Sequence, residues 1–509
     1  MANPHSFDYI IVGAGATGSV LANRLTANAT TRVLLLEAGG PDTHADIHDI
    51  GGFVRLWGSD LDWKLATEPQ LHQGDRTILI NQGRVLGGST SLNALMYVRG
   101  NPRNFDHWSA LGNSGWSYAE VLPYFKRSED YAGGTSEFHG VGGPLSVRDN
   151  PDSNSRSEAF MAGAVELGYD GPNWDYNGAR QEDGAGLLQF TIDREGNRSS
   201  AATAFLAPVR ARPNLTIITE AQVTRLLRAG TRVIGVEYSQ AGQTQPAHAE
   251  REVILSAGAF QSPRLLMLSG IGPADQLRAH DIPVITDLPG VGQNLQDHLQ
   301  LPVVYQSHRE QPLPTLLTGN VLFLQTQPDA TAGAPDLQLN FTPAVPTPLA
   351  PVLQLPVPAG IFLPILVQPR SVGTVGLRSA NPLDPPVINP NYLQHPADLQ
   401  VFIAAIKLIR ELVKTDAFVD LNAGEMLPGP DTDLEQFIRT QTSTLWHPVG
   451  TCKMGHDALA VVDPQLRVHG IAGLRVADAS VMPTIVSGNT LAACYMIGEK
   501  AADTLLEAV

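Results

Sequence analysis

Cysteine is scarce in this sequence, with only Cys452 and Cys494 among 509 residues. Two cysteines exclude a disulfide framework and a cysteine-rich metal cluster. Basic residues are also few, because 34 lysines and arginines stand against 50 acidic residues and give a formal net charge of −16. A surface of this sign repels phosphate backbones, so we expect no nucleic-acid partner.

Long apolar runs are missing as well. No stretch of the sequence approaches the roughly 18 residues that a bilayer-spanning helix needs, so we expect no membrane span. Segment 1–13 has no basic region before its apolar residues, which lead straight into a glycine turn. This pattern favours a first β-strand over a signal peptide and predicts a soluble, cytoplasmic protein. The length exceeds what one hydrophobic core usually organises, which predicts two or three domains.

The sequence does contain a glycine-rich turn between an expected strand and an expected helix. The apolar run 9–12 is typical of a parallel strand buried on both faces, and 17–25 fits a helix. Between them, Gly13, Gly15 and Gly18 form the pattern G-x-G-x-x-G. In dinucleotide-binding units the first glycine allows a tight turn, the second lets backbone amides approach a pyrophosphate, and the third lets helix and strand pack closely.

A second apolar run, 33–36, ends at Glu37, 19 residues after Gly18. A carboxylate at this place accepts hydrogen bonds from ribose hydroxyls and repels a 2′-phosphate. A glycine turn in an ordinary βαβ unit would leave Glu37 unexplained, so we predict a dinucleotide site. The motif alone does not separate FAD from NAD. The residues expected to contact the cofactor from this region are Gly13, Gly15, Ala16, Thr17, Gly18, Glu37 and Ala38.

Four further blocks resemble one enzyme family. Residues 83–106 and 258–272 are similar to the two signatures of the glucose–methanol–choline (GMC) oxidoreductases, and 446–455 and 473–490 to their C-terminal catalytic region. The blocks occur in family order, and the choline-dehydrogenase-like, HMF-oxidase-like branch is the most similar. The resemblance implies an α/β fold with an FAD-binding Rossmann-like domain and an α+β substrate-binding domain built on an antiparallel sheet. It also implies bound FAD and oxidation of a CH–OH group.

The resemblance further implies that both domains are discontinuous. The FAD-binding domain is expected from residues 1–155, 190–300 and 441–509, and the substrate-binding domain from 156–189 and 301–440.

The block 83–106 is rich in small and polar residues, which suits a backbone that passes close to a flat cofactor. Asn93 can both donate and accept hydrogen bonds at the flavin edge. Some members of the family carry a histidine bonded covalently to the flavin at the position that is Leu92 here, so we expect FAD to be held non-covalently. The cofactor contacts expected from this block are Arg84, Gly87, Gly88, Thr90, Asn93 and Ala94.

The block around 258–272 is expected to be mainly scaffold. It predicts a buried strand over 251–258 and a short helix with Ser262 as N-cap, Pro263 in its first turn and Gly270 as its terminator. The cofactor contacts expected here are Ala257 and Gly258.

Three more segments are expected to reach the cofactor. Val223 matches the place where the family hydrogen-bonds adenine through its backbone, although an alternating strand predicts the same apolar residue. A strand ends at Asp478, and the resemblance places Asp478 and Ala479 along the ribityl and pyrophosphate groups. A long helix opens at Asn489 and Thr490, and its N-terminal amides are expected to face the pyrimidine end of the isoalloxazine. The positive end of a helix dipole there stabilises the reduced flavin.

Segment 445–456 places two histidines, a cysteine and a methionine close together, which suggests a copper site. A blue-copper site needs two histidines and a thiolate around one point. Here a proline and two glycines lie among the candidates, and no distant ligand is evident, so we expect no metal. Cys452 and Met454 are then packing residues, and His456 is a surface histidine.

The resemblance places His447 where the family has its catalytic histidine, and Asn489 where the family has His or Asn. A neutral imidazole, with an ordinary pKa near ~6.5, can take the hydroxyl proton at neutral pH. The asparagine amide can hold the substrate oxygen as negative charge develops. The alternatives are a purely structural His447 and a helix-capping Asn489, and capping is compatible with catalysis. Trp446 is expected near the flavin or the substrate, the alternative being a plain core tryptophan.

The segment 341–370 contains eight prolines and one charged residue. So many prolines are expected to exclude a central strand or a regular helix. An apolar loop of this length is expected to cover something, either as a wall or lid of the substrate pocket or as a subunit interface or internally packed loop. Regular helices are expected over 398–418 and after the capping-box pattern Thr432-x-x-Glu435.

We therefore predict FAD-dependent oxidation of an alcohol to an aldehyde or ketone by hydride transfer to flavin N5. His447 is the expected base, and O₂ or another electron acceptor reoxidises the flavin. In choline-oxidising relatives a carboxylate of the substrate domain faces the ammonium group. Segment 317–325 has none, so an apolar or aromatic primary alcohol is favoured. The alternatives are a non-redox or photochemical relative of hydroxynitrile lyase or decarboxylase type, and an NAD-dependent enzyme or nucleotide-binding regulator.

Overall fold

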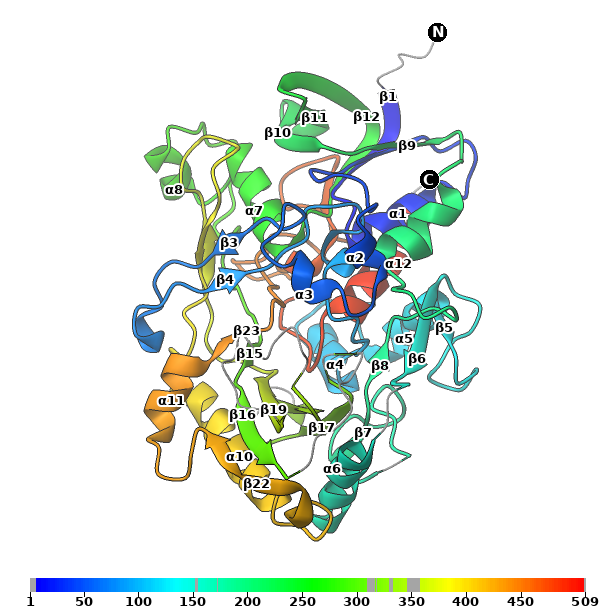
Figure 1. The fold of residues 1–509 in the computed structure, drawn as a ribbon. Helices are drawn as coiled ribbons and strands as arrows, with labels where there is room; N and C mark the ends of the chain where they lie inside the picture. Colours follow the sequence, from blue (N-terminus) through cyan, green and yellow to red (C-terminus); the bar gives the residue numbers. More distant parts are fainter. Residues whose placement is uncertain are drawn as a thin grey trace.

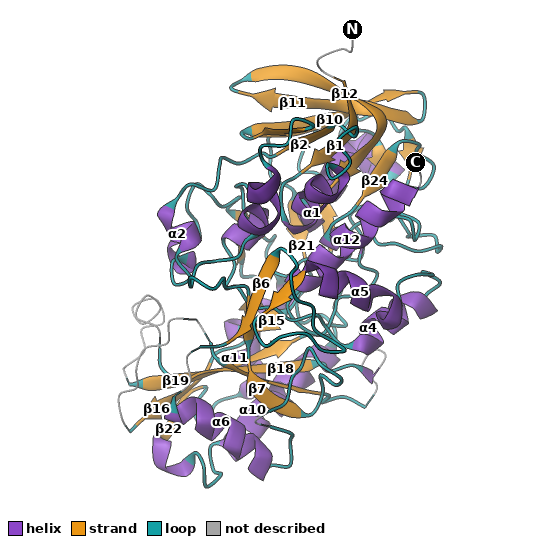
Figure 2. Cartoon of the chain, turned by 90° about the vertical axis from the view of Figure 1, so that its right-hand side faces the viewer, coloured by secondary structure: helices purple, strands orange, loops and turns teal. Residues whose placement is uncertain are grey.

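Two β-sheets dominate the computed structural model, one at each end of the molecule (Figures 1 and 2). The structure describes residues 6–151, 154–171, 173–308, 316, 318–328, 333–345 and 358–507. One sheet is mixed with a parallel core, and the other is antiparallel. The predicted combination of a Rossmann-like domain with an antiparallel-sheet domain is therefore confirmed.

The mixed sheet has the strand order β10-β11-β12-β1-β2-β9, and β24 also pairs with β12. Strand β1 pairs in parallel with β2 and β12, while β10, β11 and β12 form an antiparallel meander. Strand β2 is uniformly apolar and buried, as expected of a strand covered on both faces. The strands of this sheet are β1 (Ser6–Val12), β2 (Val33–Leu36), β9 (Leu215–Ile218), β10 (Ala221–Ala229), β11 (Arg232–Gln240), β12 (Gln243–Leu255) and β24 (Leu474–Val476).

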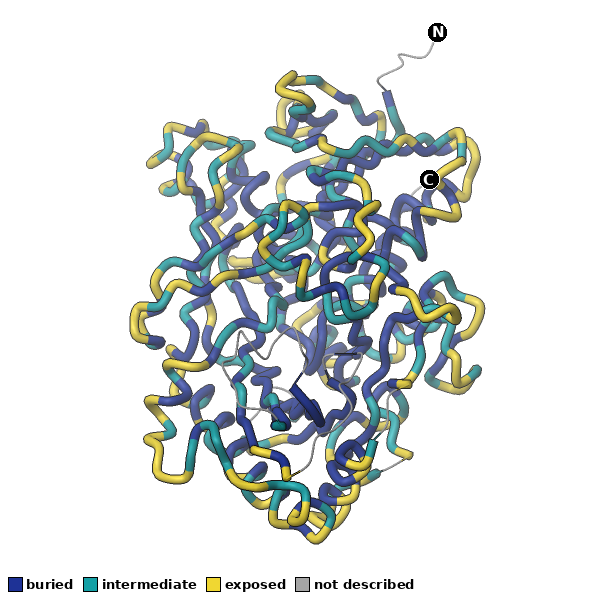
Figure 3. The backbone as a smooth tube through the Cα atoms, viewed as in Figure 1, coloured by how far each residue is buried: buried dark blue, intermediate teal, exposed yellow. Residues whose placement is uncertain are grey.

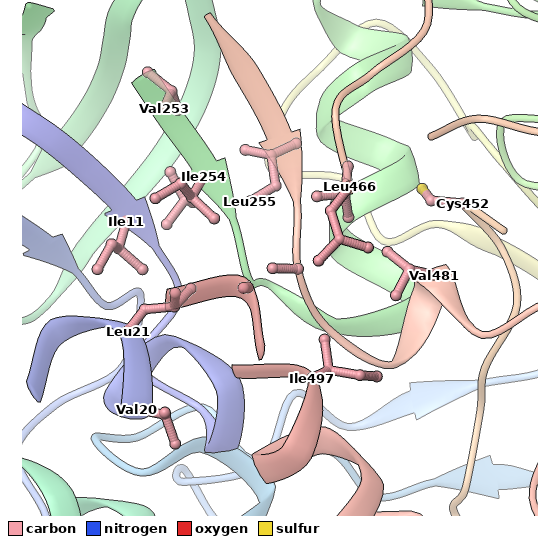
Figure 4. Packing of buried hydrophobic residues seen from close by; sticks show 14 of the residues in the cluster. Ile11, Val20, Leu21, Val253, Ile254, Leu255, Cys452, Leu466, Val481 and Ile497 are labelled. Atoms are coloured by element: carbon pink, nitrogen blue, oxygen red, sulfur yellow. The ribbon is translucent and has the colours of Figure 1, made fainter. Parts of the chain in front are cut away.

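Two helices from opposite ends of the sequence, α1 (Ala16–Leu25) and α12 (Leu491–Glu507), pack together beside this sheet. A Cβ atom added at Gly498 of α12 would lie 2.9 Å from Cβ of Val20 in α1, so the small residue permits the close approach. Figure 4 shows apolar side chains of both helices and of the strands gathered in one core. This core joins the N-terminal and C-terminal segments into a single unit.

The second sheet has the order β22-β16-β19-β18-β17-β7, extended by β15 and β23. Helices α6 (Ser155–Glu166) and α10 (Pro396–Leu412) pack on it around a cluster of phenylalanines. The strands of this sheet are β7 (Gly184–Leu187), β15 (Leu299–Gln300), β16 (Val303–Ser307), β17 (Asn320–Leu324), β18 (Leu337–Thr342), β19 (Ala359–Leu366), β22 (Asn422–Leu427) and β23 (Ser443–Thr444).

The prediction that prolines exclude a central strand from 341–370 is wrong for β19, which contains Pro364 and lies between β16 and β18. The Pro364 carbonyl accepts a hydrogen bond from the Leu301 amide, at the gap between β15 and β16. Pro364 has no N–H to donate. The missing N–H would face the gap between β15 and β16, where the loss of one hydrogen-bond donor costs little. The lid prediction for 346–357 lies outside the described residues.

The helix expected after Ser262 begins five residues earlier, as α7 (Gly258–Leu268). Ser262 is not its N-cap, because its hydroxyl donates to Asp478 and accepts from the Ala257 amide. Pro263 lies inside the helix and leaves the Ala259 carbonyl without its i+4 donor. The hydroxyl of Thr451 donates to that carbonyl at 2.6 Å, which compensates for the missing bond.

Two other predicted boundaries need correction. Helix α10 ends at Leu412 rather than residue 418, and a turn and a short 3₁₀ segment follow. The cap of α11 (Leu434–Gln441) is Asp433 rather than Thr432, because the Asp433 carboxylate accepts from the amides of Glu435 and Gln436. Thr432 instead donates its hydroxyl hydrogen to the Pro428 carbonyl.

The remaining elements are short and connect the two sheets. Figure 3 shows that the chain between the sheets is largely buried and that exposure is concentrated in outer loops. No described helix is long and apolar enough to cross a bilayer. The helices are α2 (Ala45–His48), α3 (Phe53–Leu56), α4 (Pro102–Ala110), α5 (Tyr118–Ser128) and α8 (Ala274–Ala279). The strands are β3 (Leu65–Ala66), β4 (Leu79–Ile80), β5 (Glu129–Tyr131), β6 (Leu145–Asp149), β8 (Gln189–Phe190), β13 (Ile271–Gly272), β14 (Thr286–Asp287), β20 (Thr374–Gly376) and β21 (Val387–Asn389).

Candidate active site

A cavity of about 620 Å³ is lined by both sheets and brings together most of the residues predicted from the sequence. His447 lines it, as do these predicted cofactor-binding residues: Gly13, Gly15, Ala16, Thr17, Glu37, Ala38, Gly88, Thr90, Asn93, Ala94, Val223, Ala257, Gly258, Trp446, Asp478, Ala479, Asn489 and Thr490. The three predicted residues outside its lining are Gly18, Arg84 and Gly87.

Each of these three residues has a different structural role. Gly18 packs α1 against the turn, because an added Cβ would overlap the carbonyl oxygen of Gly13. Gly87 directly precedes the short 3₁₀ segment Gly88–Ser91. The φ of Gly87 is +93°, in the left-handed region that favours glycine. Arg84 stacks over the ring of Trp63, with 5.0 Å to the ring centroid, and borders a separate hollow.

The cavity has the features of a dinucleotide cradle along the first sheet. Gly15 lines it, and a Cβ added there would meet no protein atom within 4 Å, so the turn leaves open space above its backbone. The first residues of α1 and α12 also line the cavity, and helix N-termini are suited to anionic groups. These residues fit an FAD pyrophosphate.

Two buried carboxylates hold the backbone around this cradle. Glu37 accepts hydrogen bonds from the amides of Ala14 and Gly39, at 2.9 and 2.8 Å, and burial raises its pKa. Asp478 accepts from the amide of Gly258 at 2.9 Å and from the hydroxyl of Ser262, and burial raises its pKa as well. Asp478 thus ties the end of β24 to the start of α7.

A buried arginine that the sequence reading missed supports the loop 83–94. Arg198 donates through Nη1 to the Thr90 carbonyl, and to both the backbone and the side-chain oxygen of Asn93. The Leu95 amide also donates to that side-chain oxygen, which leaves the Asn93 amide group to donate toward the cavity. Burial lowers the pKa of Arg198 to about 9.

Two of the residues that line the cavity, His447 and Asn489, contact each other. Nδ2 of Asn489 lies 3.2 Å from Nε2 of His447, and both side chains line the cavity. Burial lowers the pKa of His447 to about 3, so the imidazole is neutral at ordinary pH. Asn489 directly precedes Thr490 at the start of α12, as predicted. The pair offers a proton acceptor and an amide donor to one substrate oxygen.

Two neighbouring residues behind His447 were also missed. His298 forms a 2.9 Å hydrogen bond between its Nδ1 and Nδ1 of His447. Asp297 accepts from the His447 amide at 2.8 Å and from the hydroxyls of Tyr392 and Thr444. Burial raises the pKa of Asp297 to about 6, which leaves a carboxylate at neutral pH. In the sequence, Asp297 and His298 are the only charged or histidine residues within 288–307, a signal that could have identified them.

Trp446 adopts a strained backbone beside His447. Its φ is +62°, in the left-handed region where a bulky residue costs about 1–3 kcal/mol. Its amide donates to the Thr444 hydroxyl at 2.7 Å, and its ring lies 4.6 Å from that of Trp57. The strain lets two consecutive large side chains, Trp446 and His447, both line the cavity.

The structure gives no support to a metal site in 445–456. Within the described residues, no group of three or more His, Cys, Asp or Glu side chains could hold a metal ion. Cys452 and Met454 are buried in the first core, and His456 is exposed, as predicted.

The antiparallel sheet and segment 441–447 form the other wall of the cavity, where apolar side chains alternate with uncharged amides and hydroxyls. Among the described residues, the acidic ones that line the cavity are Glu37 and Asp478, and both lie on the side of the mixed sheet. The residues of the other wall include Gln300, Pro302, Thr342, Ile361, Leu363, Gln441, Ser443 and Leu445. Three of these, Thr342, Ile361 and Leu363, belong to the proline-rich segment, which supports the wall interpretation for its described part.

Comparison with known proteins agrees with this site. Residues 7–300 and 369–498 match the N-terminal and C-terminal profiles of the GMC oxidoreductases. The chain is a GMC oxidoreductase. Family membership gives it FAD as the expected cofactor, a CH–OH donor as substrate and a need for an electron acceptor.

Individual relatives cover nearly the whole chain. An alcohol dehydrogenase [acceptor] from Pseudomonas putida is 39% identical, over 99% of this chain and 96% of that protein. The mitochondrial choline dehydrogenase of Homo sapiens is 41% identical, over 98% of this chain and 89% of that protein. The crystal structure of pyridoxine 4-oxidase from Mesorbium loti has a TM-score of 0.92 and 34% identity, over 98% of this chain and 99% of that one.

Proposed function

We propose that this GMC oxidoreductase oxidises an uncharged apolar or aromatic primary alcohol, with His447 as the base and FAD held non-covalently. The observation that carries the substrate class is the composition of the cavity wall opposite the mixed sheet, where the described lining residues include no carboxylate. A quaternary ammonium group placed there would be desolvated without a counter-charge. The residues named for this wall are apolar or carry an uncharged amide or hydroxyl.

His447 and Asn489 have different roles in the proposed reaction. Nε2 of His447 takes the proton of the substrate hydroxyl, and Nδ2 of Asn489 donates a hydrogen bond to the oxygen that this leaves. Bound FAD would supply the hydride acceptor for the substrate carbon, which completes the two-electron oxidation to the aldehyde. His447 is suited to its step because it is neutral, and Asn489 because an amide neither takes nor loses a proton.

The non-covalent attachment rests on Leu92. This residue is buried beside the cavity and carries no atom that can bond to a flavin. Acid precipitation of the purified protein should therefore release all of the yellow chromophore into the supernatant. A chromophore that stays with the precipitate would contradict this part of the proposal.

The substrate class is tested by anaerobic mixing of the flavin-loaded enzyme with benzyl alcohol, hexan-1-ol and choline. Bleaching of the flavin absorbance should be fastest with benzyl alcohol or hexan-1-ol and slowest with choline. Faster bleaching by choline would overturn the substrate class, and no bleaching by any of the three would overturn it as well. Admission of air then shows whether O₂ or another acceptor reoxidises the enzyme, because only an oxidase recolours quickly and forms peroxide.

A further inference from the structure

The proposed reaction uses Nε2 of His447 and leaves its other ring nitrogen unexplained. That nitrogen, Nδ1, lies 2.9 Å from Nδ1 of His298, which is fully buried just before β15. The second nitrogen of His298, Nε2, lies 3.1 Å from the carbonyl oxygen of Val367, just after β19. His298 therefore connects His447 to the backbone at the end of β19 through two hydrogen bonds.

The chemistry of the groups decides which one is the donor and which one the acceptor in each of these hydrogen bonds. The Val367 carbonyl can only accept, so Nε2 of His298 carries a hydrogen. A neutral imidazole has one N–H, so Nδ1 of His298 is an acceptor, and burial keeps this ring neutral by lowering its pKa. Nδ1 of His447 must then be the donor. Because His447 is neutral as well, its Nε2 carries a lone pair and can accept a hydrogen bond.

The hydrogen bonds on the cavity side of His447 run in the same donor-to-acceptor direction. Nδ2 of Asn489 donates to Nε2 of His447, which requires that nitrogen to be unprotonated. Nε2 of Gln338 lies 3.5 Å from Oδ1 of Asn489, the orientation that leaves the Asn489 amide group for His447. Five residues on five separate segments thus form one directed series that ends on a backbone carbonyl.

We propose that His298 is a positioning residue that holds His447 in the Nδ1–H tautomer, so that the nitrogen facing the substrate is always the one able to accept a proton. The opposite tautomer would place a hydrogen on Nε2 and block the first step. The kinetic consequence rests on the proposed function, whereas the tautomer itself does not.

His298 does not pass the proton onward. A transfer from His447 to Nδ1 of His298 would make His298 a cation whose other hydrogen faces a carbonyl that cannot accept a proton. The substrate proton therefore stays on Nε2 of His447, which then carries two N–H bonds. The bond from Nδ1 to His298 becomes charge-assisted at that point and stabilises the imidazolium. The Asp297 carboxylate, held by Tyr392, Thr444 and the His447 amide, lies behind the same ring.

Two variants separate positioning from proton transfer. In His298→Gln the amide oxygen can accept from His447 and the amide group can donate to Val367, but the side chain cannot carry a proton. His298→Leu has a similar volume and offers neither bond. With benzyl alcohol under anaerobic conditions, His298→Gln should retain flavin reduction within about tenfold of wild type, and His298→Leu should lose about 10²-fold, the lower range for general-base catalysis. A loss in His298→Gln equal to that in His298→Leu, with flavin content and melting temperature unchanged, would overturn the proposal.

A second readout does not depend on any substrate. Nitrogen-15 NMR of flavin-loaded enzyme labelled at histidine should show His447, identified by its loss in His447→Gln, with a protonated Nδ1 and an unprotonated Nε2. His298→Gln should keep this pattern, and His298→Leu should populate the opposite tautomer. Wild-type His447 with a protonated Nε2 would overturn the proposal even if every alcohol reduced the flavin. If no alcohol reduces wild-type flavin while NMR shows the Nδ1–H tautomer, the proposed function fails and the positioning role stands.

Discussion

Nδ2 of Asn489 lies 3.2 Å from Nε2 of His447, although 42 residues separate the two in sequence. One residue reaches the site from the segment after β23 and the other from the start of α12. Their polar atoms point at the same space in the cavity, so a hydroxyl oxygen placed there contacts a base and a donor together. This relationship is the basis of the predictions for the catalytic pair.

Replacement of His447 should slow flavin reduction strongly and leave FAD binding intact. His447→Gln keeps the size and polarity of the side chain but has no group that takes a proton at neutral pH. We expect flavin reduction by benzyl alcohol to fall about 10²–10⁴-fold, the usual contribution of a general base. Stopped-flow absorbance measures the rate, and the flavin-to-protein absorbance ratio serves as the control. Reduction at the wild-type rate would show that His447 is not the base.

Asn489→Asp should make the reaction sensitive to pH. Burial lowers the pKa of wild-type His447 to about 3, so its rate of flavin reduction should be level from weakly acidic to alkaline pH. A carboxylate at the position of the Asn489 amide favours the imidazolium and raises the pKa of His447. The variant should therefore be slow at acidic pH and recover as the pH rises. A pH profile of the reduction rate measures this, and a profile as level as that of wild type would contradict it.

Substitutions at two glycines of the turn 13–18 should separate an effect on FAD affinity from an effect on folding stability. A Cβ at Gly15 meets no protein atom within 4 Å but enters the cavity, whereas a Cβ at Gly18 overlaps the Gly13 carbonyl. Gly15→Ala should fold with near-wild-type stability and lose affinity for FAD at least about tenfold, a cost of ~1.4 kcal/mol. Gly18→Ala should lose about 1–3 kcal/mol of stability through overpacking. Flavin-free melting temperatures and FAD titration distinguish the two, and equal behaviour would refute the assignment.

His139 should make the enzyme less stable as the solution becomes alkaline. It lies between Glu129 and Asp175, at 3.1 and 2.9 Å, and although burial opposes its charge, the bonds to both carboxylates raise its pKa above the ordinary value. A raised pKa means that the folded protein holds a proton that the unfolded chain loses near pH ~6.5. The stabilisation is complete below that pH and disappears as the pH rises through the folded-state pKa.

The corresponding measurement is the melting temperature of wild type and His139→Gln across pH 5–9. The two should differ most at the acidic end and converge at the alkaline end, where the wild-type histidine is neutral. Each unit by which the pKa is raised corresponds to about 1.4 kcal/mol. A difference that stays constant with pH would mean that His139 stabilises the protein through packing alone.

The nucleotide-binding half was predictable because its signals are local. The turn at Gly13–Gly18 and the apolar runs around it depend on neighbours within a few residues, and the structure places them as expected. The proximity of His447 and Asn489 was predictable only through the resemblance, because nothing near His447 in the sequence indicates that Asn489 lies beside it.

The residues that were missed act through contacts across the fold. His298 lies 149 residues before its partner His447, and Arg198 is more than 100 residues from the loop that it holds. The strand through Pro364 could not be foreseen either, because proline is tolerated there only owing to the gap between β15 and β16. Helix α7 began early because Thr451, far along the chain, satisfies the carbonyl that Pro263 leaves free.

The position of β1 in its sheet has a consequence for synthesis of the protein. The first strand pairs with β12, which ends at residue 255, and β12 in turn pairs with β24 at 474–476. Helix α12, which completes the cradle beside α1, follows after residue 490. A ribosome must therefore release almost the entire chain before the cofactor cavity can close. The complete FAD site needs residues beyond 490, and a truncated or stalled chain lacks that part of it.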